Sequence, residues 1–354
     1  MVSALCLFSG SLAGRVAARL VERSPGVDKV SLLHFRSPFF EENTQLRELV
    51  KQEWPGVSFR TQSLKKDYRR LANIPPGYHF SITRSCLSCR TLMLSRAIRY
   101  MERIKADFIV TGEILGCHGL SEVEMERITE TLGAQGRVVR PLSARLLPIS
   151  LAEREGWVGR DSLGDLQDGD QDRLAQLAAR LDLSAEDPMG ADRRCKLTVP
   201  GFGVRLENLF EEDGFTLNAL KLLEFEFYYK QAPDIKIVLA TDEEQKRALQ
   251  TLFLPQDLRV YLPTHPGPMT LVRTDWECKS SARIREIITL ASRITVTHSG
   301  AAHLASVQVN YRFENDDATS QLHALPFHST DEIANHCFVC NFAALFSPKK
   351  ISVA

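Results

Sequence analysis

The sequence contains no apolar run approaching the roughly 20 residues that a membrane-spanning helix needs. Its first residues, MVSALCLFSG, have neither the basic region nor the long apolar core of a secretory signal. Internal repeats and low-complexity tracts are also absent. Eight cysteines in 354 residues are too few for a disulfide framework, and they direct attention to metal or sulfur chemistry in a reducing compartment. We therefore expect a cytoplasmic globular protein with no membrane partner.

Net charge is zero, since 44 Lys and Arg balance 44 Asp and Glu. Residues 1–150 nevertheless hold 22 basic against 14 acidic residues, and the remainder holds 22 against 30. Most of the basic excess lies between residues 60 and 105, a local footprint typical of nucleic-acid binding. The arginines that we expect to contact RNA there are Arg69, Arg70, Arg90, Arg96 and Arg99. The alternative is a solvated helix face, because Arg96, Arg99 and Arg103 recur at helical spacing.

The first 150 residues alternate between predicted strands and predicted helices. Strands are predicted at 2–8, 27–35, 56–59 and 107–111, and helices after a small-residue turn at 9–14, at 42–54 and at 89–104. This alternation predicts an α/β fold with a parallel, doubly wound, Rossmann-like sheet. Ligands of such sheets bind beyond the carboxyl ends of the strands, where Ser9, Gly112 and Glu113 would lie.

The remainder of the chain has a different pattern. We expect an accessory segment at 151–215, packed on the nucleotide-binding domain at 1–150, with one clear helix at 172–181. A smaller α+β module is predicted at 216–354. Its strands are predicted at 225–229, 235–239 and 260–262, and its helices at 243–252 and 280–292.

Two short motifs in the first domain could carry chemistry. The turn Ser9-Gly10-Ser11-Leu12 joins a strand to a helix, where backbone N–H groups and the positive helix end can bind an anion; a tight connection is the alternative. The pair Cys86-x-x-Cys89 lies at the predicted start of a helix inside the basic segment. Helix N-termini and cations lower thiol pKa values, so we expect thiolates able to bind metal or carry sulfur.

These motifs and three further blocks carry a family resemblance. The blocks are ADFIVTGEILG (106–116), RPLSA (140–144) and CKLT (195–198). In this order the motifs resemble the PP-loop ATP-pyrophosphatases of tRNA thiolation, of the 4-thiouridine synthetase-like and 2-thiouridylase-like branch, over about residues 1–210. The resemblance implies an adenine nucleotide alpha hydrolase-like fold. Residues 225–309 resemble the RNA-binding module of the NFACT family, through 240–245 and 266–270.

The resemblance implies ATP-dependent adenylation of a tRNA uridine, followed by displacement of AMP by sulfur. It assigns nucleotide contacts to Ser9, Gly10, Ser11, Leu12, Thr111, Gly112, Glu113 and Arg140. Cys86, Cys89 and Cys195 match three thiolates that hold a [4Fe–4S] cluster with one iron open to hydrosulfide. Zinc, or bare thiols that carry a persulfide, are the alternatives. The implied cofactors are ATP and Mg²⁺, and the implied partners are tRNA and a sulfur-donor protein.

The chain departs from the family motif at three positions. Ser11 replaces a glycine, Ala13 replaces the acid that manages metal-bound phosphates, and Gly14 replaces the final serine. Because a methyl group cannot coordinate Mg²⁺, two alternatives stay open. One is a degenerate protein that binds RNA or nucleotide without cleaving ATP, and the other is ATP-independent, cluster-based sulfur handling.

The remaining cysteines and histidines divide into core and unassigned residues. Cys6 and Cys278 are predicted to be small buried hydrophobic residues. Cys337 and Cys340 are either free thiols or a metal pair. His118, His298 and His303 are predicted to be satisfied or surface histidines, since no third ligand lies near them in the sequence.

Overall fold

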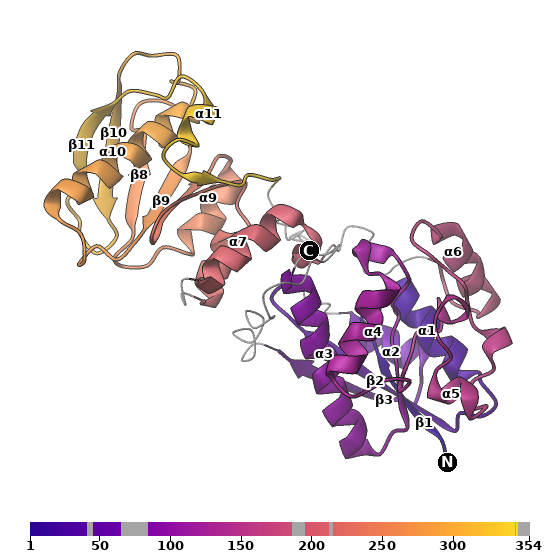
Figure 1. Ribbon diagram of the computed structural model, residues 1–354. Coiled ribbons are helices and arrows are strands. Elements are labelled where there is room, and N and C mark those ends of the chain that lie inside the picture. Colours follow the sequence, from indigo (N-terminus) through magenta and orange to yellow (C-terminus); the bar gives the residue numbers. More distant parts are fainter. Residues whose placement is uncertain (41–44, 65–83, 186–194, 212–214, 344, 346–354) are drawn as a thin grey trace. The chain divides into compact units, whose positions relative to one another are not determined.

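The computed structural model describes residues 1–40, 45–64, 84–185, 195–211, 215–343 and 345. The chain forms two compact units, Met1–Gly203 and Val204–Ala354 (Figure 1). The division falls inside α7 (Pro200–Glu211), whereas the sequence analysis places its last boundary at 215. Among the described helices, none combines the length and the apolar character that crossing a membrane requires.

The first unit contains a five-stranded sheet whose strands are all parallel. The strands are β1 (Ser3–Leu7), β2 (Lys29–Arg36), β3 (Ser58–Ser63), β4 (Phe108–Val110) and β5 (Val138–Val139). Their order in the sheet is β3-β2-β1-β4-β5, so the direction of winding reverses between β1 and β4. This confirms the predicted α/β, Rossmann-like fold class. It also places the switch point of the sheet between the two strands that precede Ser9 and Thr111.

Helices of the first unit surround this sheet. They are α1 (Leu12–Glu22), α2 (Leu46–Glu53), α3 (Arg84–Ile104), α4 (Glu122–Thr131), α5 (Leu151–Arg154) and α6 (Gln171–Arg180). Short 3-10 turns lie at η2 (Cys117–Gly119), η3 (Ala144–Leu146), η4 (Arg160–Ser162) and η5 (Lys196–Thr198). α3 begins at Arg84, before the predicted start at 89, so Cys86 and Cys89 share its first turns.

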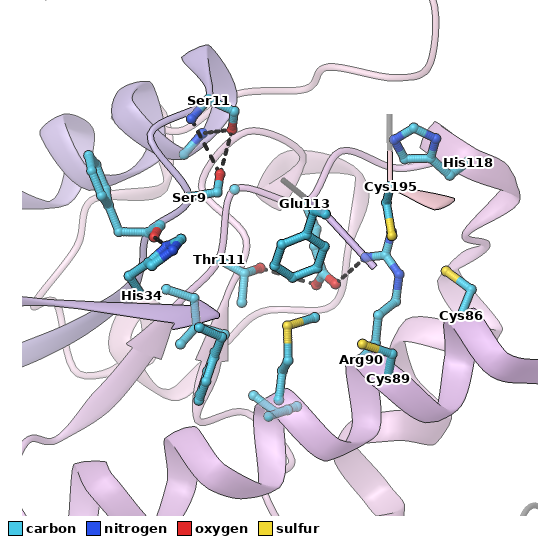
Figure 2. Close-up of a pocket in the computed structure, with 18 of the residues that line it drawn as sticks. Ser9, Ser11, His34, Cys86, Cys89, Arg90, Thr111, Glu113, His118 and Cys195 are labelled. Atoms are coloured by element: carbon cyan, nitrogen blue, oxygen red, sulfur yellow. Dashed lines mark hydrogen bonds and ion pairs between the residues drawn. The ribbon is translucent and has the colours of Figure 1, made fainter. Parts of the chain in front are cut away.

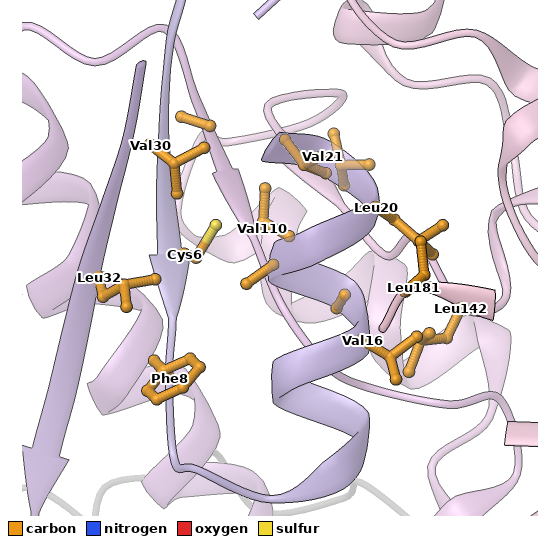
Figure 3. Close-up of a cluster of buried hydrophobic side chains, with 14 of the residues drawn as sticks. Cys6, Phe8, Val16, Leu20, Val21, Val30, Leu32, Val110, Leu142 and Leu181 are labelled. Carbon is orange, nitrogen blue, oxygen red and sulfur yellow. The ribbon is translucent and has the colours of Figure 1, made fainter. Parts of the chain in front are cut away.

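The core of the first unit lies between α1 and one face of the sheet. Val16, Leu20 and Val21 of α1 pack with Cys6 and Val110 of the strands (Figure 3). Burying aliphatic side chains stabilises the fold by about 1.5–3 kcal/mol each. Cys6 is 1% exposed within this cluster, which confirms its prediction as a core residue.

Segment 151–183 adds to the same core. Leu174, Ala178, Leu181 and Leu183, from α6 and the turn after it, join the cluster that contains α1. The apolar spacing of α6 is that of an amphipathic helix lying on a larger body. The acidic, turn-rich segment is therefore part of the first unit's hydrophobic core.

The second unit contains a seven-stranded sheet in which all pairings are antiparallel. Its strands are β6 (Phe227–Gln231), β7 (Ile235–Ala240), β8 (Leu258–Tyr261), β9 (Met269–Arg273), β10 (Val307–Phe313), β11 (Ser320–Ala324) and β12 (Phe338–Val339). Their order is β11-β10-β8-β9-β7-β6-β12. The predicted α+β module is thereby confirmed. The sequence analysis does not anticipate β9 or the strands after residue 306.

Four helices of the second unit are α8 (Leu217–Leu222), α9 (Glu243–Gln250), α10 (Ser281–Thr297) and α11 (Thr330–Ile333). Ile287, Ala291 and Ile294 of α10 pack against Val260 and Val272 on one face of the sheet. α9 contacts β7. The prediction for Cys278 is wrong: this residue is exposed, in the turn that precedes α10.

Candidate functional site

The first unit contains a pocket of about 420 Å³ at the carboxyl ends of its strands (Figure 2). It is lined by residues that follow β1, β4 and β5, by one face of α3, and by the segment around η5. The pocket therefore lies at the switch point between β1 and β4, where doubly wound sheets bind their ligands. Ser9, Gly112 and Glu113 all line it, as the sequence analysis predicts.

The turn between β1 and α1 forms one wall of this pocket. Gly10 adopts φ +83°, a left-handed conformation that glycine reaches without strain. Ser11 caps α1, its Oγ accepting from the N–H of Gly14 at 3.3 Å, while Ser9 Oγ donates to Ser11 Oγ at 2.9 Å. Ser9, Ser11 and Gly14 line the pocket, but Gly10 and Leu12 are not among its lining residues. The positive end of α1 is thus presented to the pocket.

Gly112 is required by a close backbone contact. A Cβ atom at this position would lie 2.7 Å from Gly14 Cα and 2.8 Å from Gly14 N, which real Cβ atoms do not tolerate. The strand end at Thr111 therefore touches the first turn of α1 directly. This contact closes the base of the pocket and explains why glycine stands at position 112.

Glu113 lies between two arginines. Arg90 Nη1 donates to its Oε1 at 2.7 Å, and Arg140 Nε donates to its Oε2 at 3.0 Å. Thr111 Oγ1 adds a third hydrogen bond at 3.1 Å, and Arg140 also donates to the carbonyl of Met125. Although burial alone would raise the pKa of Glu113, the two guanidinium groups lower that pKa to about 2. Glu113 is therefore ionised and neutralised, and it is not a general base at neutral pH.

This arrangement changes two predicted roles. Arg90, predicted to contact RNA, points into the pocket and pairs with Glu113, and Arg140 is 9% exposed and shares the same carboxylate. Glu113 is also the one carboxylate among the pocket-lining residues that the structure describes. With Ala13 in the place of an acid, the described pocket offers Mg²⁺ no uncommitted carboxylate. The residues present do not fit a Mg²⁺–ATP site.

Three cysteines gather at the other end of the pocket. Cys86 and Cys89 come from α3, whose pocket face continues with Arg90, Met93 and Leu94 at helical spacing. Cys195 comes from the segment before η5, which is fixed by the N–H of Lys196 donating to the carbonyl of Phe39 at 2.9 Å. Figure 2 shows the three sulfur atoms near Arg90. The structure thus unites residues that are far apart in the sequence.

The predicted lowering of the thiol pKa is wrong for Cys89. Burial raises the pKa of Cys89 well above its ordinary value, and neighbouring Cys195 and Cys86 raise it further. Burial likewise raises the pKa of Cys195 to about 12. The predicted effect of the helix N-terminus and nearby cations is outweighed at Cys89, which is only 2% exposed.

The three thiols suit an iron–sulfur cluster better than a single metal ion. Among the described residues, no three His, Cys, Asp or Glu side chains are spaced to hold a single metal ion. A zinc site is therefore not preformed. Thiolate donors suit iron–sulfur clusters, and three of them leave one iron without a protein ligand. The donor set, though not its spacing for a single ion, fits such a cluster.

None of the other described arginines predicted to contact RNA, and none of the other cysteines, lines this pocket. Arg69 and Arg70 are outside the described residues, Arg96 lies on α3 outside the pocket lining, and Arg99 is exposed. Cys117 Sγ donates to Asp168 Oδ1 at 3.3 Å. Cys337 is buried in the core of the second unit, and Cys340 is partly buried. Neither belongs to a described group that could hold a metal ion.

Sequence reasoning missed the wall of the pocket opposite the cysteines. His34 and Phe35 at the carboxyl end of β2, together with Phe8, line this side. His34 is fixed by a 2.9 Å hydrogen bond between Nδ1 and the carbonyl oxygen of Phe8, and burial lowers its pKa. Its position at the end of a strand beside the switch point is the signal that could have identified it. His118, predicted to be satisfied or on the surface, also lines the pocket.

One family model matches the chain, and its match lies within the second unit. Residues 228–336 match the family described as NFACT protein RNA binding domain. No curated protein matches the chain by sequence.

Among solved structures, the chain is similar to the C-terminal part of the fibronectin/fibrinogen-binding protein of Streptococcus suis, at 14% identity and a TM-score of 0.27. That match covers 55% of this chain and 82% of that one. The chain is also similar to the U34-tRNA thiolase NcsA of Methanococcus maripaludis, solved with its [4Fe–4S] cluster, at 14% identity and a TM-score of 0.30, covering 63% of this chain and 70% of that one.

Proposed function

We propose that this protein acts in the modification of RNA of the tRNA class by holding sulfur for delivery to a base whose carbonyl oxygen a partner activates as the leaving group, because this pocket does not fit Mg²⁺–ATP. The observation that carries the proposal is the convergence of Cys86, Cys89 and Cys195 on one pocket at the switch point of a parallel sheet. The match of residues 228–336 to an RNA-binding domain family supports RNA as the partner. Sulfur transfer to a base needs both a site that holds sulfur and a surface that holds RNA.

The thiols are positioned by the arginine–glutamate group. The Arg90 guanidinium hydrogen-bonds both Cys86 and Glu113, and Glu113 fixes it by an ion pair at 2.7 Å. Arg90 thereby places a fixed cation beside the sulfur of Cys86. Glu113 therefore acts as a positioning residue, since it holds Arg90 without itself reaching the reacting sulfur.

A cluster or a persulfide could occupy the thiol end of the pocket. Cys86, Cys89 and Cys195 would hold a [4Fe–4S] cluster, which would supply an open iron for an exogenous sulfur atom. Without metal, one of the three thiols would instead accept sulfane sulfur from the persulfide of a sulfur-donor protein, whose own cysteine leaves as a thiol. In both versions the partly apolar wall around His34 and Phe35 would receive the substrate and exclude water.

A second function is favoured by the state of Glu113 and by the residue at position 13. Glu113 is neutralised by Arg90 and Arg140, and Ala13 cannot bind a metal. The chain would then bind RNA or a nucleotide phosphate at the β1–α1 turn without cleaving ATP. The backbone N–H groups at the start of α1 are suited to that binding, because a helix N-terminus attracts a phosphate without help from a metal ion.

Analysis of iron, labile sulfide and persulfide in anaerobically purified protein tests sulfur handling. We expect either cluster iron or a persulfide in the wild-type protein, and its loss in Cys86→Ser. Cys278→Ser is the matched control, because it removes an exposed thiol of the other unit. A folded protein with neither iron nor persulfide, with equal values in both variants, contradicts the proposal and leaves the second function.

Thionucleoside content of tRNA provides an independent readout. In cells that lack the chain, re-expression of wild type should restore a sulfur-containing nucleoside that Cys195→Ser does not restore. ATP binding by calorimetry, with and without Mg²⁺, completes the comparison. Nucleotide affinity that does not depend on Mg²⁺, without release of pyrophosphate, is the signature of the second function.

A further inference from the structure

The second unit contains a pocket of about 360 Å³ that has no part in the site described above. Its lining comes from β8, β10, α9 and the loop 262–268. Leu258 and Val260 of β8 are buried against α10, so Arg259 and Tyr261 project from the opposite face of the sheet. The volume lies within the range of about 300–1,000 Å³ that is typical of ligand pockets.

The pocket collects positive charge. Arg259 on β8 and Arg312 on β10 are paired directly across two antiparallel strands, a position in which like charges destabilise a sheet. Glu314 accepts from Nε and Nη2 of Arg259 at 2.7 and 3.1 Å, which leaves Nη1. Arg312 forms no ion pair within the part of the chain that the structure describes. None of the described lining residues is a carboxylate, although Lys246, the third cation, pairs with Glu243 outside the lining.

An aromatic ring lies beside the cations. Tyr261 lines the pocket two residues after Arg259 and is partly exposed. Its cross-strand neighbour, Asn310, is not among the residues that line the pocket. The ring of Tyr261 is therefore the group on which a flat ligand could stack.

The rim of the pocket is held in place by the loop before β9. The N–H of Gly300 donates to the carbonyl of Pro266 at 3.1 Å. A Cβ atom on Gly267 would lie 3.1 Å from Ser299 Cβ and 3.2 Å from Leu262 Cδ1, so the loop packs closely on the turn after α10. The segment Thr264-His265-Pro266-Gly267-Pro268 is therefore fixed before any ligand arrives, which lowers the entropy cost of binding.

We propose that this pocket binds one nucleotide of single-stranded RNA. Its phosphate binds Arg259, Arg312 and Lys246, and its base stacks on Tyr261. Aromatic rings beside cations are the usual elements of single-strand recognition. This inference rests on the proposed function, which gives the protein RNA as its partner.

Fluorescence anisotropy of the full chain with a labelled single-stranded RNA tests the pocket. Arg312→Ala should weaken binding about tenfold and reduce the salt slope by about one unit. Tyr261→Ala should weaken binding by a similar factor through lost stacking, while Tyr261→Phe retains wild-type affinity. The matched control is Arg285→Ala, which removes the same charge from an exposed position on α10, and it should bind as wild type does.

The outcomes separate this inference from the proposed function. Unchanged RNA affinity in folded Arg312→Ala and Tyr261→Ala overturns the pocket assignment, while wild-type binding and thionucleoside formation leave the proposed function standing. A wild-type protein that binds no RNA removes the basis of both. Inorganic phosphate that binds the pocket as tightly as the RNA does also overturns the inference, because the site is then a small-anion pocket.

Discussion

Both units enclose arginine side chains, but the groups that accept their hydrogen bonds differ. In the first unit Arg90 and Arg140 share the carboxylate of Glu113. In the second unit Arg205, on α7, is completely buried and contacts no carboxylate in the described structure. Its N–H groups donate to carbonyl oxygens of Cys340, Leu223, Phe225 and Glu226 at 2.6–2.9 Å. The guanidinium also lies 5.0 Å from the ring centroid of Tyr228 and 4.0 Å from that of Phe342.

The difference separates a functional arrangement from a structural one. The arginines around Glu113 line a pocket, and the charge of their partner can be removed by acid. The N–H groups of Arg205 donate to backbone carbonyls of separate chain segments, so few of them could bind a ligand. It joins α7, the corner before β6 and the strand end at Cys340, which makes it a clamp within the second unit.

Replacement of Arg205 is expected to have the largest effect on the free energy of unfolding. Arg205→Met keeps much of the apolar volume but leaves several buried carbonyl oxygens without donors. Each such group costs about 1–3 kcal/mol, so we expect the second unit to lose about 4 kcal/mol of unfolding free energy. Hydrogen exchange of β6 and α8 peptides measures this loss separately from the first unit. Protection of β1 and β4 should remain unchanged.

Arg205→Lys provides the matched control for charge. An ammonium group keeps the positive charge but cannot reproduce the planar fork, so most of the loss should remain. Full protection in Arg205→Lys would show that charge alone, rather than the set of carbonyl bonds, holds the segments together.

The carboxylate predicts the next effect, in the first unit. Glu113→Gln removes the charge between Arg90 and Arg140, and it leaves two partly buried guanidinium groups uncompensated. Because the pKa of Glu113 is lowered from 4.5 to about 2, the ionised group contributes about 3 kcal/mol. Hydrogen exchange of α3 and β4 peptides at pH 7 should show this loss.

The same pKa fixes the pH dependence. A lowered folded-state pKa means that the stabilisation is complete above about pH 4.5 and is lost as the pH falls through about 2. Wild type and Glu113→Gln should therefore differ most above pH 5 and converge near pH 2. Curves that stay parallel down to pH 2 would show that Glu113 is not ionised at neutral pH.

The parallel sheet could be predicted because its signals are local. Short apolar strands, the small-residue turn at 9–14 and amphipathic helices recur in sequence order, and the switch-point rule then places Ser9 and Glu113 together. The antiparallel sheet was predicted less completely. Its order, β11-β10-β8-β9-β7-β6-β12, depends on pairings between distant segments that no local period records.

The candidate site shows the same limit. The three cysteines could be associated by resemblance, but the two arginines on Glu113 could not, since Arg90, Glu113 and Arg140 lie on three separate elements. The lowered thiol pKa that the sequence predicts for Cys89 is wrong for a related reason. Helix position can be estimated from sequence, whereas the burial of Cys89 depends on how α3 packs.

The smallest effect on stability is expected at a carboxylate that also has two arginine partners but is more exposed to solvent. Asp165 also receives hydrogen bonds from two arginines, Arg145 and Arg173, but these side chains are 46% and 50% exposed. Water and salt screen such pairs, so Asp165→Asn should cost under about 1 kcal/mol, and the loss should shrink further in 0.5 M salt. Hydrogen exchange of α6 measures the change beside that of Glu113→Gln. If the two variants lose equal stability, enclosure by the pocket contributes nothing, and the number of arginine partners alone determines the strength of these groups.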